Sequence, residues 1–244
     1  MLAFITGSGF YDLPAVTDRE DRSVDTPYGS VVVTTGRWDG YPMAFLARHG
    51  RDHSVAPQEI DYRANVWALR HLGADAIVAT AVSGGIAPTM APGDLVLIDD
   101  YLDWTTGRAA TFFDQPGEVR HVDMSAPYHP GLRAVLARAA EVEGLALHPG
   151  GTYACCNGPR FETRAEIRAL AALGADLVGM TGYPEVALAV EAGVPYASVG
   201  VIANPAAGLA DRDISLEEIM AVLDGAAGPL LGLFGRALAL WAQR

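Results

Sequence analysis

Short apolar segments alternate with amphipathic segments of helical period along most of this 244-residue chain. The apolar segments have the length and the bounding Gly, Pro or Asp residues of buried strands, and the amphipathic ones repeat apolar residues every three or four positions. We expect strands near 2–6, 31–34, 43–47, 76–82, 94–99, 151–155, 177–180 and 196–202, and helices near 58–72, 131–142, 163–173, 185–192 and 215–241. This alternation predicts an α/β fold with three layers, in which helices flank both faces of a mixed, mainly parallel β-sheet.

Length and composition predict one domain over residues 1–244. Half of the residues are apolar and 19% are charged, so a chain of this size can bury a large core without splitting. Gly, Pro or charged residues interrupt the apolar runs before the ~18 residues that a membrane span needs. No basic region precedes an apolar core at the N-terminus. We therefore expect a soluble, cytoplasmic protein with no membrane partner.

Charge and cysteine content exclude other classes of partner. The formal net charge of −12 would repel nucleic acid, and no basic run offsets it. Cys155 and Cys156 are adjacent, so they cannot join distant segments, and we expect two buried thiols in a reducing compartment. The six histidines lack metal-ligand spacing, so we expect no metal site.

Three segments at expected strand ends could bind a small oxyanion. Gly7-Ser8-Gly9 offers backbone N–H groups and a hydroxyl, Arg48-His49-Gly50 offers cationic or donor side chains, and residues 81–85 contain a glycine-rich turn. Each also has a simpler interpretation, as an ordinary turn, a solvated pair or a tight bend. Their occurrence at successive strand ends favours phosphate. The chain lacks a Gly-Lys-Ser phosphate loop and a full Gly-x-Gly-x-x-Gly, which argues against a nucleotide polyphosphate.

A second group of side chains follows later strands and could hold a flat, hydrogen-bonding ring. Phe161 offers an aromatic face, Glu162 an acceptor carboxylate and Asn204 an amide, each where a buried strand gives way to a loop. These residue types together predict a purine pocket. Glycosidase chemistry, with Glu162 and Asp211 as opposed carboxylates, is a weaker alternative that spacing cannot support.

These motifs resemble the trimeric purine nucleoside phosphorylase and methylthioadenosine phosphorylase superfamily over nearly the whole chain. The resemblance rests on Phe45-Leu46-Ala47-Arg48-His49-Gly50, on residues 61–69 and on Gly158-Pro159-Arg160-Phe161, which look like the methylthio branch. It implies the phosphorylase-type fold and inorganic phosphate as a co-substrate, without a cofactor. It also implies a homotrimer with shared active sites, in which His121 contacts the neighbouring subunit's substrate.

The resemblance further assigns roles to individual residues. It implies that Asn204, Glu162 and His49 are catalytic. Phosphate would be held by Ser8, Arg48, His49 and Val82. The nucleoside would contact Phe161, Glu162, Met180, Thr181, Asn204, Leu216 and, from the neighbour, His121.

Departures from each branch favour a 6-oxopurine nucleoside. Glu162 and Asn204 look like the pair of the 6-oxopurine enzymes, whereas enzymes for methylthioadenosine resemble Gly-Pro-Arg-Phe-Ser and carry aspartates near Asn204. Hypoxanthine and guanine present an N1–H donor to a carboxylate, but adenine N1 is an acceptor that a carboxylate would repel.

The 5′ end of the ribose is the second discriminator. Where ordinary inosine and guanosine phosphorylases resemble His-Glu-Glu, this chain has Leu216-Glu217-Glu218, which suits a methylthio group. Leu216 could instead belong to the core. The closest resemblance is therefore to S-methyl-5′-thioinosine phosphorylases.

Several alternative functions follow from the same residues. A general inosine and guanosine phosphorylase and a methylthioadenosine phosphorylase are the near ones. A hydrolytic nucleosidase would act without phosphate, and Arg48-His49 argues against it. A nucleoside sensor would bind without turnover.

Overall fold

The computed structural model describes residues 1–8 and 15–244, whose strands form one ten-stranded sheet. The strands are β1 Leu2–Thr6, β2 Val16–Thr26, β3 Gly29–Trp38, β4 Tyr41–Ala47, β5 Ala76–Gly85, β6 Leu95–Leu97, β7 Asp100–Trp104, β8 Thr152–Cys156, β9 Leu177–Gly179 and β10 Tyr196–Pro205. Their order is β2-β3-β4-β1-β5-β9-β8-β7, and β10 pairs with both β5 and β6. The pairs that β5 makes with β1 and β10, and the β1–β4, β7–β8 and β8–β9 pairs, are parallel. The mixed, mainly parallel sheet is therefore confirmed.

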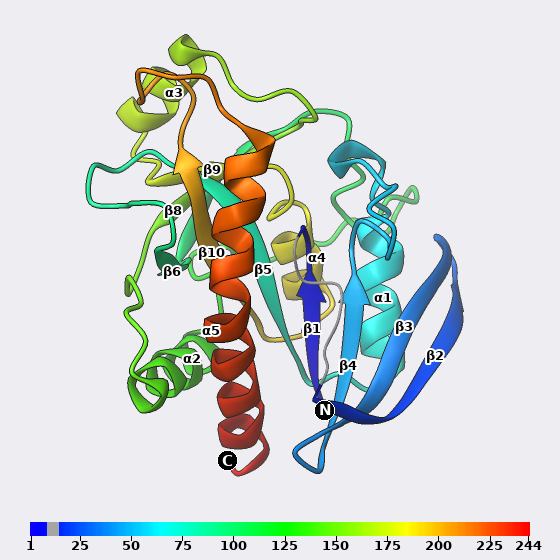
Figure 1. The fold of residues 1–244 in the computed structure, drawn as a ribbon. Helices are drawn as coiled ribbons and strands as arrows, with labels where there is room; N and C mark the ends of the chain where they lie inside the picture. The colour runs from blue at the N-terminus through cyan, green and yellow to red at the C-terminus, as the bar shows by residue number, and fades with distance from the viewer. Residues whose placement is uncertain (9–14) are drawn as a thin grey trace.

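Helices cover both faces of this sheet, as the alternation predicts (Figure 1). They are α1 Tyr62–His71, α2 Pro130–Glu143, α3 Arg164–Ala172, α4 Glu185–Glu191 and α5 Leu216–Ala242, with a 3₁₀ turn at Pro57–Glu59. The alternation of side chains along β1 explains the two covered faces. Leu2 and Phe4 join the cluster under α2 and α5, whereas Ala3 and Ile5 join the cluster under α1 and α4. The three-layer α/β architecture is confirmed.

Two strands lie outside the pattern that the sequence predicts. β2 is highly charged and almost wholly exposed, and among the described strands its one partner is β3, at the edge of the sheet. β7 follows β6 directly and is also largely exposed. Neither buries one regular face, so neither shows the apolar alternation by which a strand is found in a sequence.

Helix α5 has a longer apolar stretch than we expect of any segment from the sequence. By length and composition alone this 27-residue helix could cross a membrane, although interruptions in its apolar run argued otherwise. In the structure it lies against the sheet, where Leu223, Leu230 and Phe234 belong to the core. Packing therefore explains part of its apolar character, since 33% of its most apolar 18-residue window is buried.

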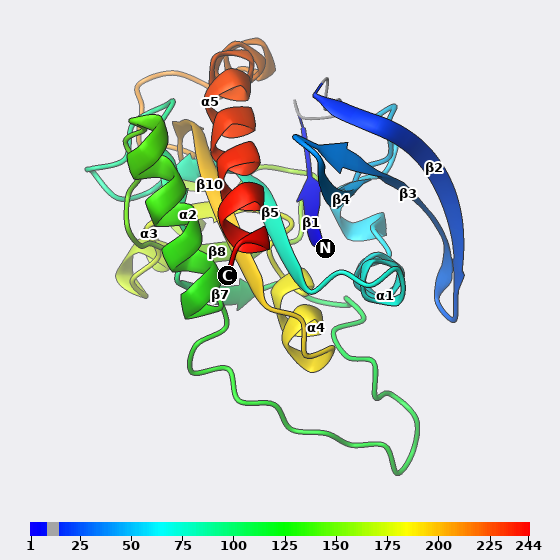
Figure 2. The same ribbon diagram turned by 90° about the horizontal axis from the view of Figure 1, so that it is seen from below.

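The long connection between β7 and α2, residues 105–129, extends away from the body of the protein (Figure 2). Most of its residues are exposed. Asp114 of this connection pairs with Arg63 of α1 at 2.7 Å, and the Arg63 guanidinium lies over the Tyr28 ring.

Candidate functional site

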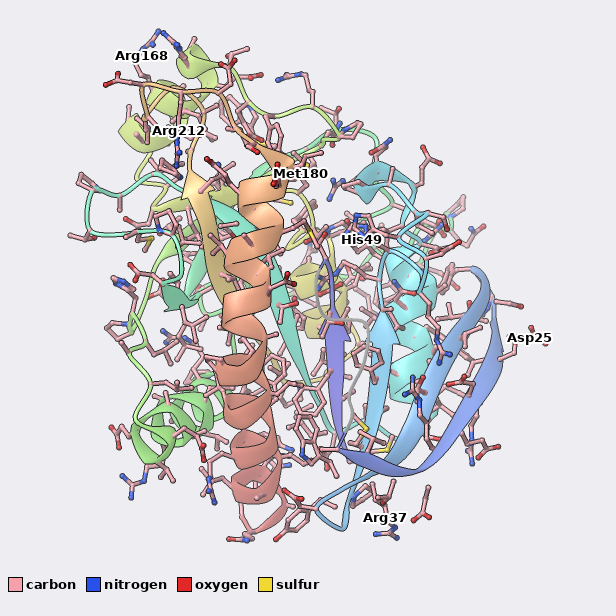
Figure 3. The ribbon with its side chains drawn as sticks, in the orientation of Figure 1. Asp25, Arg37, His49, Arg168, Met180 and Arg212 are labelled. Carbon is pink, nitrogen blue, oxygen red and sulfur yellow. The ribbon has the colours of Figure 1, made fainter. Side chains whose placement is uncertain are left out.

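A cavity of about 660 Å³ opens where β1, β4, β5 and β10 end, beside the N-terminus of α5. Figure 3 shows His49 and Met180, two of its lining residues, at this end of the sheet. Ligands in open α/β sheets bind at this position, because the loops that follow parallel strands converge there. Ten predicted site residues line it, namely Ser8, Arg48, His49, Val82, Phe161, Glu162, Met180, Thr181, Asn204 and Leu216.

The Arg48 guanidinium is locked at one end of the cavity by a buried ion pair. Its Nε and Nη2 atoms donate to the two carboxylate oxygens of Glu185 at 3.0 and 2.7 Å, and Nη1 donates to the Thr80 carbonyl at 2.7 Å. Both charged side chains are almost completely buried. Tyr196 also donates to Glu185, at 2.7 Å. Arg48 is therefore no solvated surface residue, and its direction is fixed before any ligand binds.

His49 lies beside Arg48 and is neutral in this environment. Its Nδ1 atom donates to the Val55 carbonyl at 2.8 Å, which leaves Nε2 as an acceptor. Burial, together with the charges of Arg48 and His53, lowers the pKa of His49 to about 4. An anion bound here would reverse part of this effect, because it favours the protonated ring.

The turn after β1 brings its backbone close to both side chains. A Cβ at Gly7 would lie 3.2 Å from Nη1 of Arg48 and 3.6 Å from Nε2 of His49, so glycine permits this approach. Ser8 lines the same end of the cavity, whereas Gly9 lies outside the described residues.

The expectation of a glycine-rich turn at 81–85 is wrong. These residues belong to β5, and Gly84 and Gly85 pair with both β9 and β10. A Cβ at Gly84 would lie 3.1 Å from the Ala206 backbone, so close strand packing requires glycine there. Val82 still lines the cavity, as part of a strand.

Glu162 faces the opposite end of the cavity with a free acceptor. Its Oε1 atom is buried and has no hydrogen-bond partner among the described residues. Burial raises the pKa of this carboxyl, while its own backbone and the Cys156 thiol oppose the rise. A buried acceptor without a partner costs free energy until a donor arrives. Glu162 is also the one carboxylate among the described lining residues, which removes the Glu162–Asp211 pair.

The segment that carries Glu162 is anchored by the start of α3. Thr163 caps the helix and forms a capping box with Glu166. Arg160 donates to Glu166 at 2.9 and 2.7 Å and to the Phe161 carbonyl at 3.0 Å. Phe161 remains 40% exposed and lines the cavity, so an aromatic face is available to a ring.

Asn204 lies at the end of β10, at a shift in strand register. Its Nδ2 atom donates to the Pro205 carbonyl at 2.7 Å. This bond uses one N–H of the amide, so a second N–H and the carbonyl oxygen remain for a ligand.

Met180 and Thr181, which follow β9, also line the cavity. The Tyr153 hydroxyl accepts a bond from the Thr181 backbone N–H at 3.2 Å, deep in the core. A Cβ at Gly158 would lie 2.5 Å from the Met180 sulfur, and Gly158 has φ +69°. Glycine is therefore required at Gly158 for the two loops to pack together.

The first turn of α5 supplies an apolar wall. Ser215 caps the helix by accepting a bond from the Glu218 N–H, and the Glu218 carboxylate pairs with Arg212. Leu216 is 69% exposed and lines the cavity, which excludes the interpretation that it belongs to the core.

Comparison with known proteins explains this combination of fold and cavity. Residues 1–239 match the family model described as the phosphorylase superfamily. This chain belongs to the phosphorylase superfamily. A relative from Thermococcus kodakarensis named probable 6-oxopurine nucleoside phosphorylase is 48% identical over 228 residues, which cover 91% of this chain and 85% of the relative. The predicted resemblance is thus confirmed.

This chain is also similar to two proteins that carry other names within the superfamily. One from Xanthomonas campestris, named probable S-methyl-5′-thioinosine phosphorylase, is 43% identical and covers 96% of this chain and 95% of the relative. The structure of methylthioadenosine phosphorylase from Schistosoma mansoni with adenine has a TM-score of 0.95 and 31% identity, and covers 100% of this chain and 92% of that one. The phosphorylase-type fold is therefore confirmed.

His121 is the one predicted site residue that the structure keeps away from the cavity. It is exposed in the extended 105–129 connection and does not line the cavity of its own chain. Its expected role in this superfamily member therefore requires a second subunit.

Several residues of the site escaped the sequence analysis, and three of them shape its two walls. Glu185 follows Pro184 at the start of a predicted helix, and nothing local shows that its partner is Arg48, 137 positions earlier. Ile219 and Met220 extend the apolar wall begun by Leu216. Their spacing of three and four residues from Leu216 could have identified them, because such positions share one helix face.

Proposed function

We propose that this protein cleaves the N-glycosidic bond of 6-oxopurine nucleosides with inorganic phosphate, and that S-methyl-5′-thioinosine is its preferred substrate. The products are hypoxanthine and 5-methylthioribose 1-phosphate. One observation carries the choice of base: the buried, unpartnered Oε1 of Glu162 beside Phe161 and Asn204 in one cavity.

Recognition of the base follows from the groups that are left unpaired. The N1–H of hypoxanthine donates to Glu162 and satisfies its free oxygen, whereas adenine N1 would place an acceptor against it. The face of Phe161 stacks on the ring, and the spare N–H of Asn204 donates to N7. A wrong base leaves a buried acceptor unpaired, at a cost of roughly 1–3 kcal/mol.

The proposed reaction uses Arg48 at one end of the cavity and Asn204 at the other. A phosphate oxygen attacks C1′ of the ribose as the C1′–N9 bond breaks, and the bonding electrons pass to the purine. Arg48 holds the phosphate below the cationic sugar, and Asn204 stabilises the purine anion through N7. The purine then takes a proton from solvent. Phosphate is a co-substrate, and no cofactor enters these steps.

The apolar wall of α5 supports the methylthio group. Leu216, Ile219 and Met220 line the cavity from the start of α5, and the 5′ substituent of the nucleoside is proposed to pack against them. An apolar wall favours a thiomethyl group and leaves a hydroxyl without a partner.

A general inosine and guanosine phosphorylase is the second candidate. The exposure of Leu216, at 69%, would let water reach a 5′-hydroxyl in the absence of a lid or a neighbouring subunit. The Pyrococcus furiosus relative named 6-oxopurine nucleoside phosphorylase, 45% identical over 98% of this chain, is consistent with this activity.

We further propose a cytoplasmic homotrimer in which His121 reaches a neighbour's cavity. The support is the position of His121, exposed on a long connection and remote from its own cavity. Mass measurement in solution and a mixing test, in which His121→Ala subunits are combined with Arg48→Ala subunits, would detect sharing. Activity recovered above both parents is the expected result.

The test of the proposed function is phosphorolysis followed by ultraviolet absorbance. Methylthioinosine, inosine, guanosine and methylthioadenosine are compared by kcat/KM, each with and without phosphate. Phosphate-dependent preference for methylthioinosine is expected. Preference for inosine or guanosine would select the second candidate, and turnover without phosphate would indicate a hydrolase.

A further inference from the structure

Arg108, at the near end of the 105–129 connection, donates to an unusual set of acceptors. Its Nη2 atom shares two N–H groups among three backbone carbonyls, those of Cys156 at 3.2 Å, Asn157 at 3.1 Å and Met180 at 2.8 Å. Its Nη1 atom donates to the Tyr183 carbonyl and, at 3.3 Å, to the Tyr62 hydroxyl. The guanidinium also lies over the Tyr62 ring.

These carbonyls belong to the two segments that carry the nucleoside end of the cavity. Cys156 is the last residue of β8, Asn157 follows it, and Glu162 comes five residues after Asn157. Met180 is itself a lining residue, and Tyr183 ends the turn that follows it. Arg108 does not line the cavity, yet it joins the segment that holds Glu162 to the segment that holds Met180.

No carboxylate explains the position of Arg108. The ion pairs recorded among residues 1–8 and 15–244 do not include it, and its Nε is buried without a partner there. The recorded partners of this cation are neutral groups, four backbone carbonyls together with the Tyr62 side chain and the Cys155 sulfur. Only the planar fork of arginine can donate to four carbonyls of two segments at once, because lysine presents a single nitrogen.

We infer that Arg108 is a positioning residue for nucleoside recognition: it fixes the separation between the Glu162 and Met180 segments, so that base and ribose bind in register. This inference rests on the proposed function. The phosphate end is held by a separate set of bonds, through Arg48, Glu185 and Thr80, none of which involves Arg108. Loss of Arg108 should therefore affect the two substrates unequally.

The experiment compares Arg108→Ala and Arg108→Lys with a matched control, Arg63→Ala. Arg63 also ties the 105–129 connection to the body, through Asp114, but contacts neither segment of the cavity. KM for methylthioinosine and for phosphate is measured for each variant. Calorimetric titration with hypoxanthine and with phosphate gives a readout independent of turnover. Thermal unfolding reports the stability of each variant.

For Arg108→Ala we expect KM for the nucleoside and Kd for hypoxanthine to rise by roughly 10- to 100-fold, because displacements of about 1 Å have effects of this size. The phosphate constants should change by less than about threefold, a margin set by the separate bonding of that end. Arg108→Lys should recover only part of the loss, and it replaces the alanine variant if that variant does not fold. Arg63→Ala should leave all four constants near wild type.

Three results would overturn the inference: equal losses for both substrates, full rescue by lysine, or the same nucleoside defect in Arg63→Ala. A wild-type protein without phosphorolysis would instead contradict the proposed function. The two failures are therefore distinguishable.

Discussion

The two ends of the cavity are built in opposite ways. At the phosphate end, Arg48 and Glu185 are almost fully buried. Arg48 donates hydrogen bonds to both carboxylate oxygens of Glu185 and to the Thr80 carbonyl. At the base end, Glu162 keeps an unpartnered oxygen and Phe161 keeps 40% of its surface exposed. One end is organised before any ligand binds, and the other is completed by the ligand.

The difference separates catalysis from selection. A fixed cation can stabilise charge without reorganising during the reaction. An unpaired buried acceptor discriminates among ligands, because only a base with the matching donor removes its penalty. We therefore expect changes at the phosphate end to affect stability and phosphate use, and changes at the base end to affect substrate choice.

The largest effect should come from breaking the buried ion pair. Glu185→Gln leaves the Arg48 charge without its partner, so the free energy of unfolding should fall by about 3 kcal/mol. kcat/KM for phosphate should fall by roughly 10²-fold as the guanidinium loses its orientation. Urea unfolding and initial rates at varied phosphate measure both.

A surface pair provides the control for Glu185→Gln. Glu143→Gln removes the partner of Arg236, whose 2.8 Å contact lies near solvent, and should cost less than about 1 kcal/mol. Equal losses in the two variants would contradict the rigid phosphate end.

Asn204→Ala should lower kcat by roughly 10²-fold, because its amide acts on the charge that develops at N7. Asn157→Ala is the matched control, since the Asn157 amide bonds only Thr106 outside the cavity. Single-turnover rates with methylthioinosine give the comparison. Unchanged turnover in Asn204→Ala would remove it from catalysis.

The neutral His49 predicts a pH dependence of stability. Its pKa of about 4 in the folded protein lies below the ordinary value of about 6.5, so unfolding takes up a proton between these pH values. This contribution is complete above pH 6.5 and is lost as the pH falls towards 4, by about 3 kcal/mol. Denaturant unfolding of wild type and His49→Gln over pH 4–7 should show a shallower dependence in the variant. Identical dependence would show that folding does not change the pKa of His49, and would contradict its burial as a neutral ring.

The smallest effect should come from Leu216→Ala. Because Leu216 is 69% exposed, its removal should reduce the preference for methylthioinosine over inosine by only about threefold. Met220 is 44% exposed, so Met220→Ala should reduce this preference somewhat more than Leu216→Ala does. Competition between the two nucleosides measures the ratio, and a reversal of preference would show that Leu216 alone sets the 5′ specificity.

The sequence predicts the buried parts of this molecule better than its edges. Residues 76–82 and 196–202 are predominantly apolar and carry no charge, so the central strands β5 and β10 could be expected. β2 could not, because an exposed, charged edge strand depends on its partner β3 and not on a buried face. The glycines of β5 were mistaken for a turn, since close packing and turning both require glycine.

The same limit applies to the site. Residues such as Arg48 and Glu162 stand at strand ends, where position along the sheet already suggests a ligand. Glu185 and Arg108 act through partners far away in sequence, and no local pattern records such partners. Residues in contact with ligand could be predicted, whereas those that position them required the structure.

The most direct test of the central claim is the ratio of kcat/KM for methylthioinosine to that for methylthioadenosine, in wild type and in the double variant Glu162→Ser with Asn204→Asp. A wild-type ratio well above 1 that falls by roughly 10- to 100-fold in the variant is predicted, because the variant lacks the carboxylate whose unpartnered Oε1 selects N1–H. A variant that stays as selective for hypoxanthine as the wild type would contradict it.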